Sequence, residues 1–377
     1  PKKKPNKSSG NVAVVCRVRP RIASEHQDRR CFDFDSNKKL TLNMASDSHG
    51  HFNSNTFEFD KVLGPDSDQK EVYDEAARPI VESVLEGFNG AIFAYGQTAS
   101  GKTYTMIGDN IDDVETQGII PRMVRTVFSR IQSASEDMEF SLKVSMCEIY
   151  NENIKDLLNP SKKNLKIYEE KNKGVYIQDI TERWCVDEHQ VYQLLRFGNK
   201  NRAMASTAMN NQSSRSHSLF ILTLLMTNTA DGTSKSGRLY LVDLAGSERV
   251  SRSGASGQLL EEAKSINQSL STLGKVILAL TDKRITYIPY RDSKLTRILT
   301  ESLGGNSKTC LVITCSPHSS NEAENLSTLR FGSRARNIKN VPKVNREYSV
   351  AELKLLLEKA EEKVKTHEMR IRVLASQ

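Results

Sequence analysis

The segment Gly96-Gln97-Thr98-Ala99-Ser100-Gly101-Lys102-Thr103 decides the fold class, because it fits the phosphate-binding pattern G-x-x-x-x-G-K-[ST] in full. An apolar run at residues 90–95 precedes it and predicts a strand, while residues 104–106 can continue a helix. Glycines there let consecutive backbone N–H groups face phosphate oxygens, and a helix N-terminus adds favourable partial charge. A glycine-rich turn without a ligand is the alternative, and the flanking strand and helix argue against it.

Two residues of this loop predict the ligand. Lys102 would reach the outer phosphates, and the Thr103 hydroxyl would ligate Mg²⁺. The loop alone therefore predicts a site for a nucleoside triphosphate with its metal ion.

Composition narrows the partners of the chain. The 377 residues allow one large domain or two ordinary ones, and 54 basic against 46 acidic residues give a net charge of +8. This charge favours a polyanionic partner, which could be a nucleic acid, an anionic membrane or an acidic protein surface. The six cysteines form no C-x-x-C pair, so we expect buried reduced thiols. No run of about 18 apolar residues is present, and we expect neither a membrane span nor a secretory signal.

Apolar runs alternate with amphipathic segments from residue 12 to about residue 339. Strands are expected at residues 12–18, 91–95, 141–149, 218–226, 238–242 and 309–315. Helices are expected at residues 70–87, 116–133, 187–205, 258–281 and 291–303. This alternation predicts an α/β fold whose sheet is covered by helices on both faces.

The chain changes character after residue 339. Residues 340–349 are polar and contain Pro342, which predicts an extended linker. Residues 350–374 follow a heptad pattern. The a positions are Leu357, Val364 and Ile371, and the d positions are Leu353, Ala360, His367 and Leu374. The pattern predicts about three heptads of a coiled coil, the start of a longer rod, and a single helix packed on its own domain is the alternative.

Two further polar segments suggest what is done with the nucleotide. Asp243-Leu244-Ala245-Gly246-Ser247-Glu248 follows the expected strand at 238–242, so Asp243 can hold the metal through water and Gly246 can offer its N–H to a γ-phosphate. Asn210-Asn211-Gln212-Ser213-Ser214-Arg215-Ser216-His217 suits neither strand nor helix, and its hydroxyls predict a loop that binds phosphate, metal and water.

These three segments together resemble the motor domain of kinesins. Tyr290-Arg291-Asp292-Ser293-Lys294-Leu295-Thr296-Arg297 is similar to the family's microtubule-contacting segment, and Arg17-Val18-Arg19-Pro20 to its base-binding segment. Residues 257–271 and 343–354 resemble conventional (transport) kinesin heavy chains, especially fungal and protist ones.

The resemblance implies a P-loop NTPase of the kinesin motor fold, with a central mixed sheet between helices. It implies a motor domain at residues 11–339, a neck linker at 340–349 and a neck coiled coil at 350–377. The basic residues 1–10 would be flexible and could pair with the linker as a cover strand.

The resemblance also implies the roles of matched residues. ATP or ADP would be bound with Mg²⁺, ligated by Thr103 and Ser214 and, through water, by Asp243. Arg215 and Glu248 would pair across the two mobile loops when ATP is bound, and Glu248 would help to relay the proton of the attacking water. Arg17, Arg19, Pro20 and Tyr104 would pack against the adenine. The implied catalytic residues are Lys102, Ser214, Arg215, Gly246 and Glu248, and the loop at 96–103 with Asn210, Ser213 and Ser214 would bind the nucleotide.

The implied partner is the microtubule, whose acidic surface would meet basic residues at Arg249, Arg252, Lys264, Arg291, Lys294 and Arg297. The resemblance implies movement toward microtubule plus ends as a homodimer, in the cytoplasm and on the cytoskeleton, with no nucleic acid and no membrane insertion. Gln268 departs from the Lys that many conventional kinesins carry, which predicts slightly weaker track affinity.

Three other classes compete with this interpretation. A GTPase would show an N-K-x-D-like motif, and residues 337–340 do not form one; a nucleotide kinase would lack the two coupled loops. A family member that destabilises microtubule ends usually has a basic neck before the motor, and a myosin-like actin motor has a far longer core. Measuring ATPase with and without microtubules separates these classes.

Overall fold

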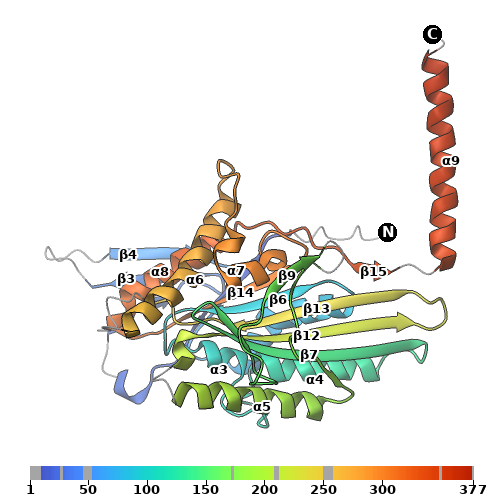
Figure 1. Cartoon of the computed structure of the whole chain (residues 1–377). Helices are drawn as coiled ribbons and strands as arrows, with labels where there is room; N and C mark the ends of the chain where they lie inside the picture. Colours follow the sequence, from blue (N-terminus) through green and yellow to red (C-terminus); the bar gives the residue numbers. More distant parts are fainter. Residues whose placement is uncertain are drawn as a thin grey trace.

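A twisted central sheet forms the middle layer of the molecule (Figure 1). The computed structural model describes residues 10–25, 29–45, 53–170, 174–207, 212–248, 258–347 and 350–375. The strand order is β11-β7-β12-β13-β6-β14-β1-β5, while β8 pairs with β7 and β15 with β13. These strands are β1 (Ala13–Val18), β5 (Lys61–Leu63), β6 (Gly90–Tyr95), β7 (Met138–Tyr150), β8 (Asn153–Asp156), β11 (Arg183–Cys185), β12 (His217–Asn228), β13 (Ser234–Asp243), β14 (Lys308–Cys315) and β15 (Asn345–Glu347).

The sheet is mixed, as expected. Strands β5, β1, β14, β6 and β13 run parallel to their neighbours in that order, whereas β13, β12, β7 and β11 form an antiparallel half. Parallel strands β6 and β13 lie side by side with Val242 opposite Phe93 and Asp243 opposite Ala94. Because both strands end at the same edge, the two loops that follow them meet there.

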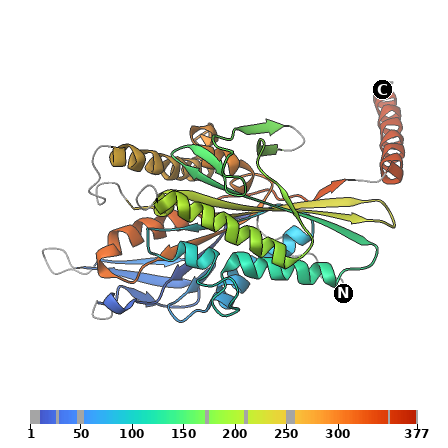
Figure 2. The same ribbon diagram turned by 60° about the horizontal axis from the view of Figure 1, so that its bottom comes forward.

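Helices cover both faces of the sheet (Figures 1 and 2). One face carries α2 (Arg78–Leu85), α4 (Ile119–Gln132) and α5 (Glu188–Thr207), and the other carries α6 (Gln258–Thr281), α7 (Lys294–Ile298) and α8 (Glu322–Ala335). Residues of β6 alternate between two buried clusters, with Phe93 and Tyr95 on the α6 and α8 side and Ile92 and Ala94 on the other. This alternation gives the chain two hydrophobic layers around one sheet.

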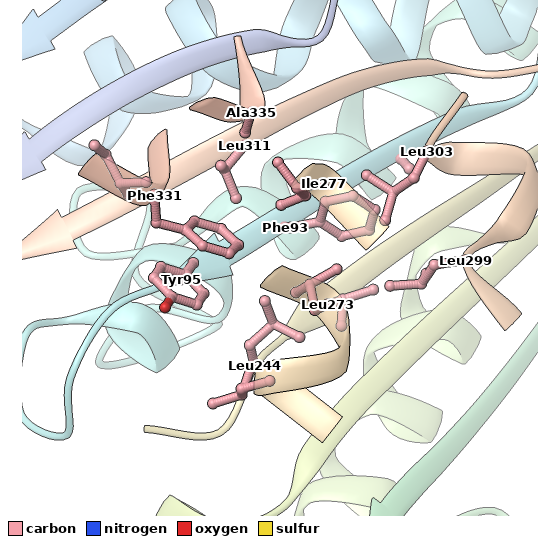
Figure 3. Packing of buried hydrophobic residues seen from close by; sticks show 14 of the residues in the cluster. Phe93, Tyr95, Leu244, Leu273, Ile277, Leu299, Leu303, Leu311, Phe331 and Ala335 are labelled. Atoms are coloured by element: carbon pink, nitrogen blue, oxygen red, sulfur yellow. The ribbon is translucent and has the colours of Figure 1, made fainter. Parts of the chain in front are cut away.

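The layer below α6 is packed tightly with large side chains (Figure 3). Leu273 and Ile277 of α6 meet Phe93 and Leu311 of the sheet, and the Phe331 ring of α8 stacks on Tyr95 with centroids 3.8 Å apart. Each fully buried aliphatic side chain stabilises such a layer by roughly 1.5–3 kcal/mol.

Two small sheets lie beside the main one. They are β2 (Phe32–Phe34), β3 (Lys39–Met44) and β4 (Asn53–Glu58), and the pair β9 (Ile167–Glu170) and β10 (Gly174–Ile177). None of these strands was expected. The sequence of β4, Asn53–Glu58, shows why, since Phe57 is its only apolar residue.

Several expected helices differ from the structure. The prediction of one continuous helix at 291–303 is wrong. The segment contains a 3₁₀ turn at Tyr290–Asp292, helix α7 and a second 3₁₀ turn at Thr300–Ser302. The helix expected at 70–87 is α1 (Gln69–Val72) and α2, joined by a π turn at Tyr73–Ala77 that precedes Pro79. Helix α8 was missed, since the polar residues Glu322, Glu324 and Asn325 at its start conceal its apolar stripe.

The polar segment after α8 lies extended along the core. Its strand β15 pairs antiparallel with β13, with Asn345 opposite Ser236. Helix α9 (Val350–Ala375) follows and projects away from the sheet (Figure 1). The a-position side chains Leu357, Val364 and Ile371 are 55–64% exposed. None of the described helices has both the length and the apolar character that crossing a membrane requires.

Candidate nucleotide site

The phosphate-binding pattern forms the turn between β6 and α3 (Lys102–Met106). A β-carbon at Gly96 would lie 2.3 Å from the carbonyl oxygen of Thr314, so only glycine fits there. Gly101, with φ 99°, takes the left-handed conformation that glycine adopts freely. Ala99 also has a left-handed φ of 62°, and its carbonyl oxygen accepts a hydrogen bond from Arg19 Nε at 2.8 Å. A residue with a β-carbon is strained in this conformation.

Lys102 lies inside the turn that it follows. Its ammonium donates a hydrogen bond to the Gln97 carbonyl at 2.8 Å, and its side chain is 8% exposed. Burial lowers the pKa of Lys102, while Asp243 opposes that shift. Ser100, also buried, bonds to the Thr314 hydroxyl at 2.7 Å and fixes the turn against β14.

Asp243 ends β13 beside the first turn of α3. Its Oδ2 accepts hydrogen bonds from the Thr103 hydroxyl at 2.7 Å and from Arg202 Nη1 at 3.0 Å. Arg202 comes from α5 and also lies 4.0 Å from the buried Glu148 carboxylate. Two buried carboxylates thus flank one guanidinium, and removing one partner of such a set costs roughly 3–5 kcal/mol.

The segment after Asp243 folds back onto the phosphate-binding turn. Both carboxylate oxygens of Glu248 accept hydrogen bonds from Thr98, from its N–H at 2.8 Å and its hydroxyl at 2.6 Å. The Gly246 N–H bonds to the Ser214 carbonyl at 2.9 Å, which joins all three predicted loops. A β-carbon at Gly246 would lie 2.4 Å from both Glu248 and Thr98, so glycine is required for this approach.

A cavity of about 500 Å³ opens where these loops meet. Its lining includes Thr98, Ala99, Gly101, Lys102, Thr103, Tyr104, Arg202, Ser214 and Asp243. The structure therefore brings residues from four distant segments to one hollow of ligand size. Arg215 lies in the adjoining 3₁₀ turn at Gln212–Arg215 and is half-buried.

The residues predicted to pack against the adenine do not all line the same cavity. Arg17 is 5% exposed, donates to Gln69 and Thr105, and its guanidinium lies 5.3 Å from the Tyr104 ring centre. Burial lowers the pKa of Arg17 to about 10, so it stays charged at neutral pH. Arg19 pairs with Glu25 through both terminal nitrogens at 2.7 Å.

Pro20 is exposed beside Arg19. It lines a second hollow of about 510 Å³ with Phe32 and Pro317, whereas Tyr104 lines the first.

Several predicted residues cannot be described in full. Asn210, Arg249 and Arg252 lie outside the described residues, and for Ser213 and Lys264 only the backbone is described. Of the other predicted track residues, Arg291 is exposed and pairs with Glu169 at 3.2 Å, while Lys294 and Arg297 are half-buried on α7. Lys294 begins α7, and its N–H donates to the Glu152 carboxylate at 2.7 Å.

The linker is anchored by two asparagines. Asn345 Nδ2 donates to Asn89 Oδ1 at 2.9 Å and to the Ser236 carbonyl at 3.0 Å, and Asn345 Oδ1 accepts from Asn306 at 3.1 Å. The sequence analysis gave no role to Asn340, which is 6% exposed.

Both the nitrogen and the oxygen of the Asn340 side-chain amide make hydrogen bonds. It donates to the carbonyls of Ser302 and Ser307 and to the Thr309 hydroxyl, and it accepts from the Gly304 N–H at 2.7 Å. Of the proposed cover strand at residues 1–10, only Gly10 is described, and its carbonyl accepts a hydrogen bond from the Asn340 N–H. The next residue, Asn11, pairs with Lys339.

His217 ends the polar segment at residues 210–217, and the sequence predicted no role for it. It begins β12, is 2% exposed, and burial lowers its pKa to about 3, with the Arg202 charge adding to the effect. Its Nδ1 accepts from the Ala245 N–H at 3.0 Å and its Nε2 lies 2.8 Å from the Ser269 hydroxyl of α6. A histidine at the start of a buried strand was the available signal.

The donor set around Asp243 fits a hydrated magnesium ion bound to a nucleotide. The Asp243 Oδ1 is buried and, within the described residues, makes no hydrogen bond, while the hydroxyls of Thr103 and Ser214 line the same cavity. Mg²⁺ prefers oxygen ligands and keeps several waters. The described part of the chain contains no cluster of three His, Cys, Asp or Glu side chains for a metal, so phosphate oxygens would complete the shell.

Comparisons with known proteins agree on one family. The kinesin motor domain family matches residues 17–338. The chain is 51% identical to the kinesin heavy chain of Syncephalastrum racemosum over 97% of this chain and 39% of that protein, and 52% identical to kinesin-related protein 3 of Dictyostelium discoideum over 94% and 30%. It therefore spans well under half the length of these relatives.

A solved structure extends this agreement to three dimensions. The structure described as a fast kinesin, with implications for ATPase mechanism and interactions with microtubules, matches with a TM-score of 0.85 and 49% identity, over 92% of this chain and 97% of that one. The expected motor fold is thus confirmed, and the chain belongs to the kinesin motor domain family.

Proposed function

We propose that this chain is an ATP-driven motor domain that hydrolyses ATP in the cavity beside Lys102 and moves along microtubules. One observation carries the proposal: the Glu248 segment, the Ser214 loop and the phosphate-binding turn are hydrogen-bonded to one another around one cavity. Loops held together in this way can respond as a unit to the presence of a γ-phosphate.

The chain's own residues have distinct tasks in hydrolysis. Lys102 would exchange the Gln97 carbonyl for phosphate oxygens, since its ammonium already lies inside the turn. The Gly246 N–H would donate to the γ-phosphate, and Glu248 would leave Thr98 to pair with Arg215 and accept a proton passed on from the attacking water. Phosphoryl transfer depends mainly on such positioning and charge stabilisation.

Thr103, Ser214 and Asp243 would hold the metal of the nucleotide. Bound there, Mg²⁺ neutralises negative charge on the phosphates. Arg202 orients the Asp243 carboxylate through its 3.0 Å hydrogen bond.

The partner follows from charge and from the placement of α6 and α7. Exposed basic residues attract an acidic filament and speed encounter. We propose that microtubules are bound by Arg291, Lys294 and Arg297 together with Arg249, Arg252 and Lys264. The family and the order of motor, linker and helix favour plus-end movement in the cytoplasm, with Leu357, Val364 and Ile371 forming a homodimer seam.

A steady-state ATPase assay with and without microtubules tests the proposal. We expect strong activation by microtubules, none by actin, and loss of turnover in Lys102→Ala. Gliding on polarity-marked microtubules then tests direction. ATPase that is indifferent to microtubules would contradict the proposed function.

A further inference from the structure

His217 contacts both the Asp243–Glu248 segment of the nucleotide site and helix α6, which carries a proposed filament contact. Its Nδ1 accepts the Ala245 N–H at 3.0 Å, inside the Asp243–Glu248 segment. Its Nε2 lies 2.8 Å from the hydroxyl of Ser269 in α6, which is 2% exposed. One ring thus spans the gap between the nucleotide loops and the helix on the filament side.

The hydrogen bonds determine the tautomer. Because the Ala245 N–H is a donor, Nδ1 must carry the lone pair, so the proton of the neutral ring is on Nε2. The Nε2–H therefore donates to Ser269 Oγ. Both ring nitrogens are used in a fixed direction, and the short, rigid ring permits little slack.

Apolar contacts also join the described side chains of α6 to this region. Leu273 and Ile277 pack on Leu244 and Phe93 in the apolar layer (Figure 3). Apolar burial is non-directional and tolerates small sliding of a helix. The bond to Ser269 is directional, so it distinguishes one position of α6 from a shifted one.

We propose that His217 is a positioning residue that couples the Asp243–Glu248 segment to α6, so that movement of the Ala245 backbone changes the position of α6 through Ser269. The inference rests on the proposed function, because its output is filament affinity. It adds a defined connection, from Ala245 through the imidazole to Ser269, by which the nucleotide state reaches the filament side.

The test uses Ser269→Ala in the whole chain. The readout is the ratio of microtubule dissociation constants measured by co-sedimentation with ADP and with a non-hydrolysable ATP analogue. Removing the acceptor strands a buried N–H, and we expect the ratio to fall roughly tenfold while ATPase without microtubules stays within about twofold. Ser269→Thr keeps the hydroxyl and should restore the ratio.

Two further variants separate coupling from stability. Thr272→Val removes another buried hydroxyl of α6, 3% exposed, and should leave the ratio unchanged. His217→Asn combined with Ser269→Ala should lower the ratio no further than either change alone, since both break the same connection. If Ser269→Ala does not fold, Ser269→Cys fills the same volume with a weaker acceptor and takes its place.

The outcomes are distinct. A tenfold lower ratio in Ser269→Ala, restored by Thr, supports the connection. A lower melting temperature with an unchanged ratio means that the bond only stabilises the fold, and overturns the inference while leaving the proposed function intact. A wild-type chain without nucleotide-dependent microtubule affinity overturns the proposed function and this inference with it.

Discussion

Glu248 and Thr98 are 150 positions apart in the chain and are joined by two hydrogen bonds, at 2.8 Å to the Thr98 N–H and 2.6 Å to its hydroxyl. The carboxylate is thereby held against the phosphate-binding turn. Gly246 makes this approach possible, because any β-carbon there would lie 2.4 Å from both residues. The contact with Thr98 is one of two positions proposed for the Glu248 carboxylate, and pairing with Arg215 is the other.

Glu248→Ala should bind ATP and hydrolyse it very slowly. The change removes the group that would accept the proton, a contribution on the order of 10²–10⁴-fold in rate, but leaves Lys102 and Thr103 in place. Turnover with microtubules and binding of a fluorescent nucleotide measure the two effects separately. Glu136→Ala, an exposed loop residue, is the control. Turnover like that of the wild type would refute the role of Glu248.

Ala99→Gly should stabilise the chain by about 0.5–1 kcal/mol. A left-handed φ of 62° costs an alanine more than a glycine, and this relief exceeds the gain in unfolded-state entropy. Urea unfolding measures the difference. Ala230→Gly, in the exposed turn between β12 and β13 with no positive φ, should destabilise slightly. Equal effects at the two positions would contradict the strain assigned to Ala99.

Asn345→Ala should release the linker from the core. Its side chain makes hydrogen bonds with Asn89, Ser236 and Asn306, each worth about 1 kcal/mol net. We expect a wider distance distribution between labels on the linker and the core, and slower gliding with little change in microtubule-activated ATPase. Asn337→Ala, in the exposed turn after α8, is the control. An unchanged distance distribution would show that Asn345 does not hold the linker.

Raising the ionic strength should release the ADP-bound chain from microtubules. Between about 0.01 M and 0.15 M salt the screening length falls from about 30 Å to about 8 Å, which weakens contacts between exposed charges. Co-sedimentation across this range gives the dependence of microtubule affinity on salt concentration, and Arg291→Gln should make that dependence weaker. Arg130→Gln, exposed on α4 beneath the other face of the sheet, should leave it unchanged. Binding that is insensitive to salt would argue against an electrostatic contact.

The sequence predicted the elements whose signals lie within contiguous residues. The run at 90–95 and the glycine spacing after it predicted β6, the phosphate-binding turn and the start of α3, and the period of apolar residues predicted α6 with its observed bounds. The three polar segments predicted one site. In the structure, two of them meet because the parallel strands β6 and β13 end at the same edge of the sheet.

The sequence failed where local signals conflict or are weak. Helix α8 begins with two acidic residues in its first turn, both of them buried, so its polar start conceals a core helix. The chain over 291–303 has a helical apolar period, yet Ser293 has extended backbone angles and caps α7, which divides the segment. The tertiary context overrides propensity at both places.

By itself the sequence determined the fold class, the family and the three polar segments proposed for the site, since each of these is written in short patterns of side-chain size, polarity and backbone freedom. Only the tertiary structure decided which partners these residues take: Arg202 between Asp243 and Glu148, Glu248 against Thr98, and His217 between Ala245 and Ser269. The physical reason is that a hydrogen bond requires a distance and a direction between atoms, and in these cases the packing of helices against the sheet sets both.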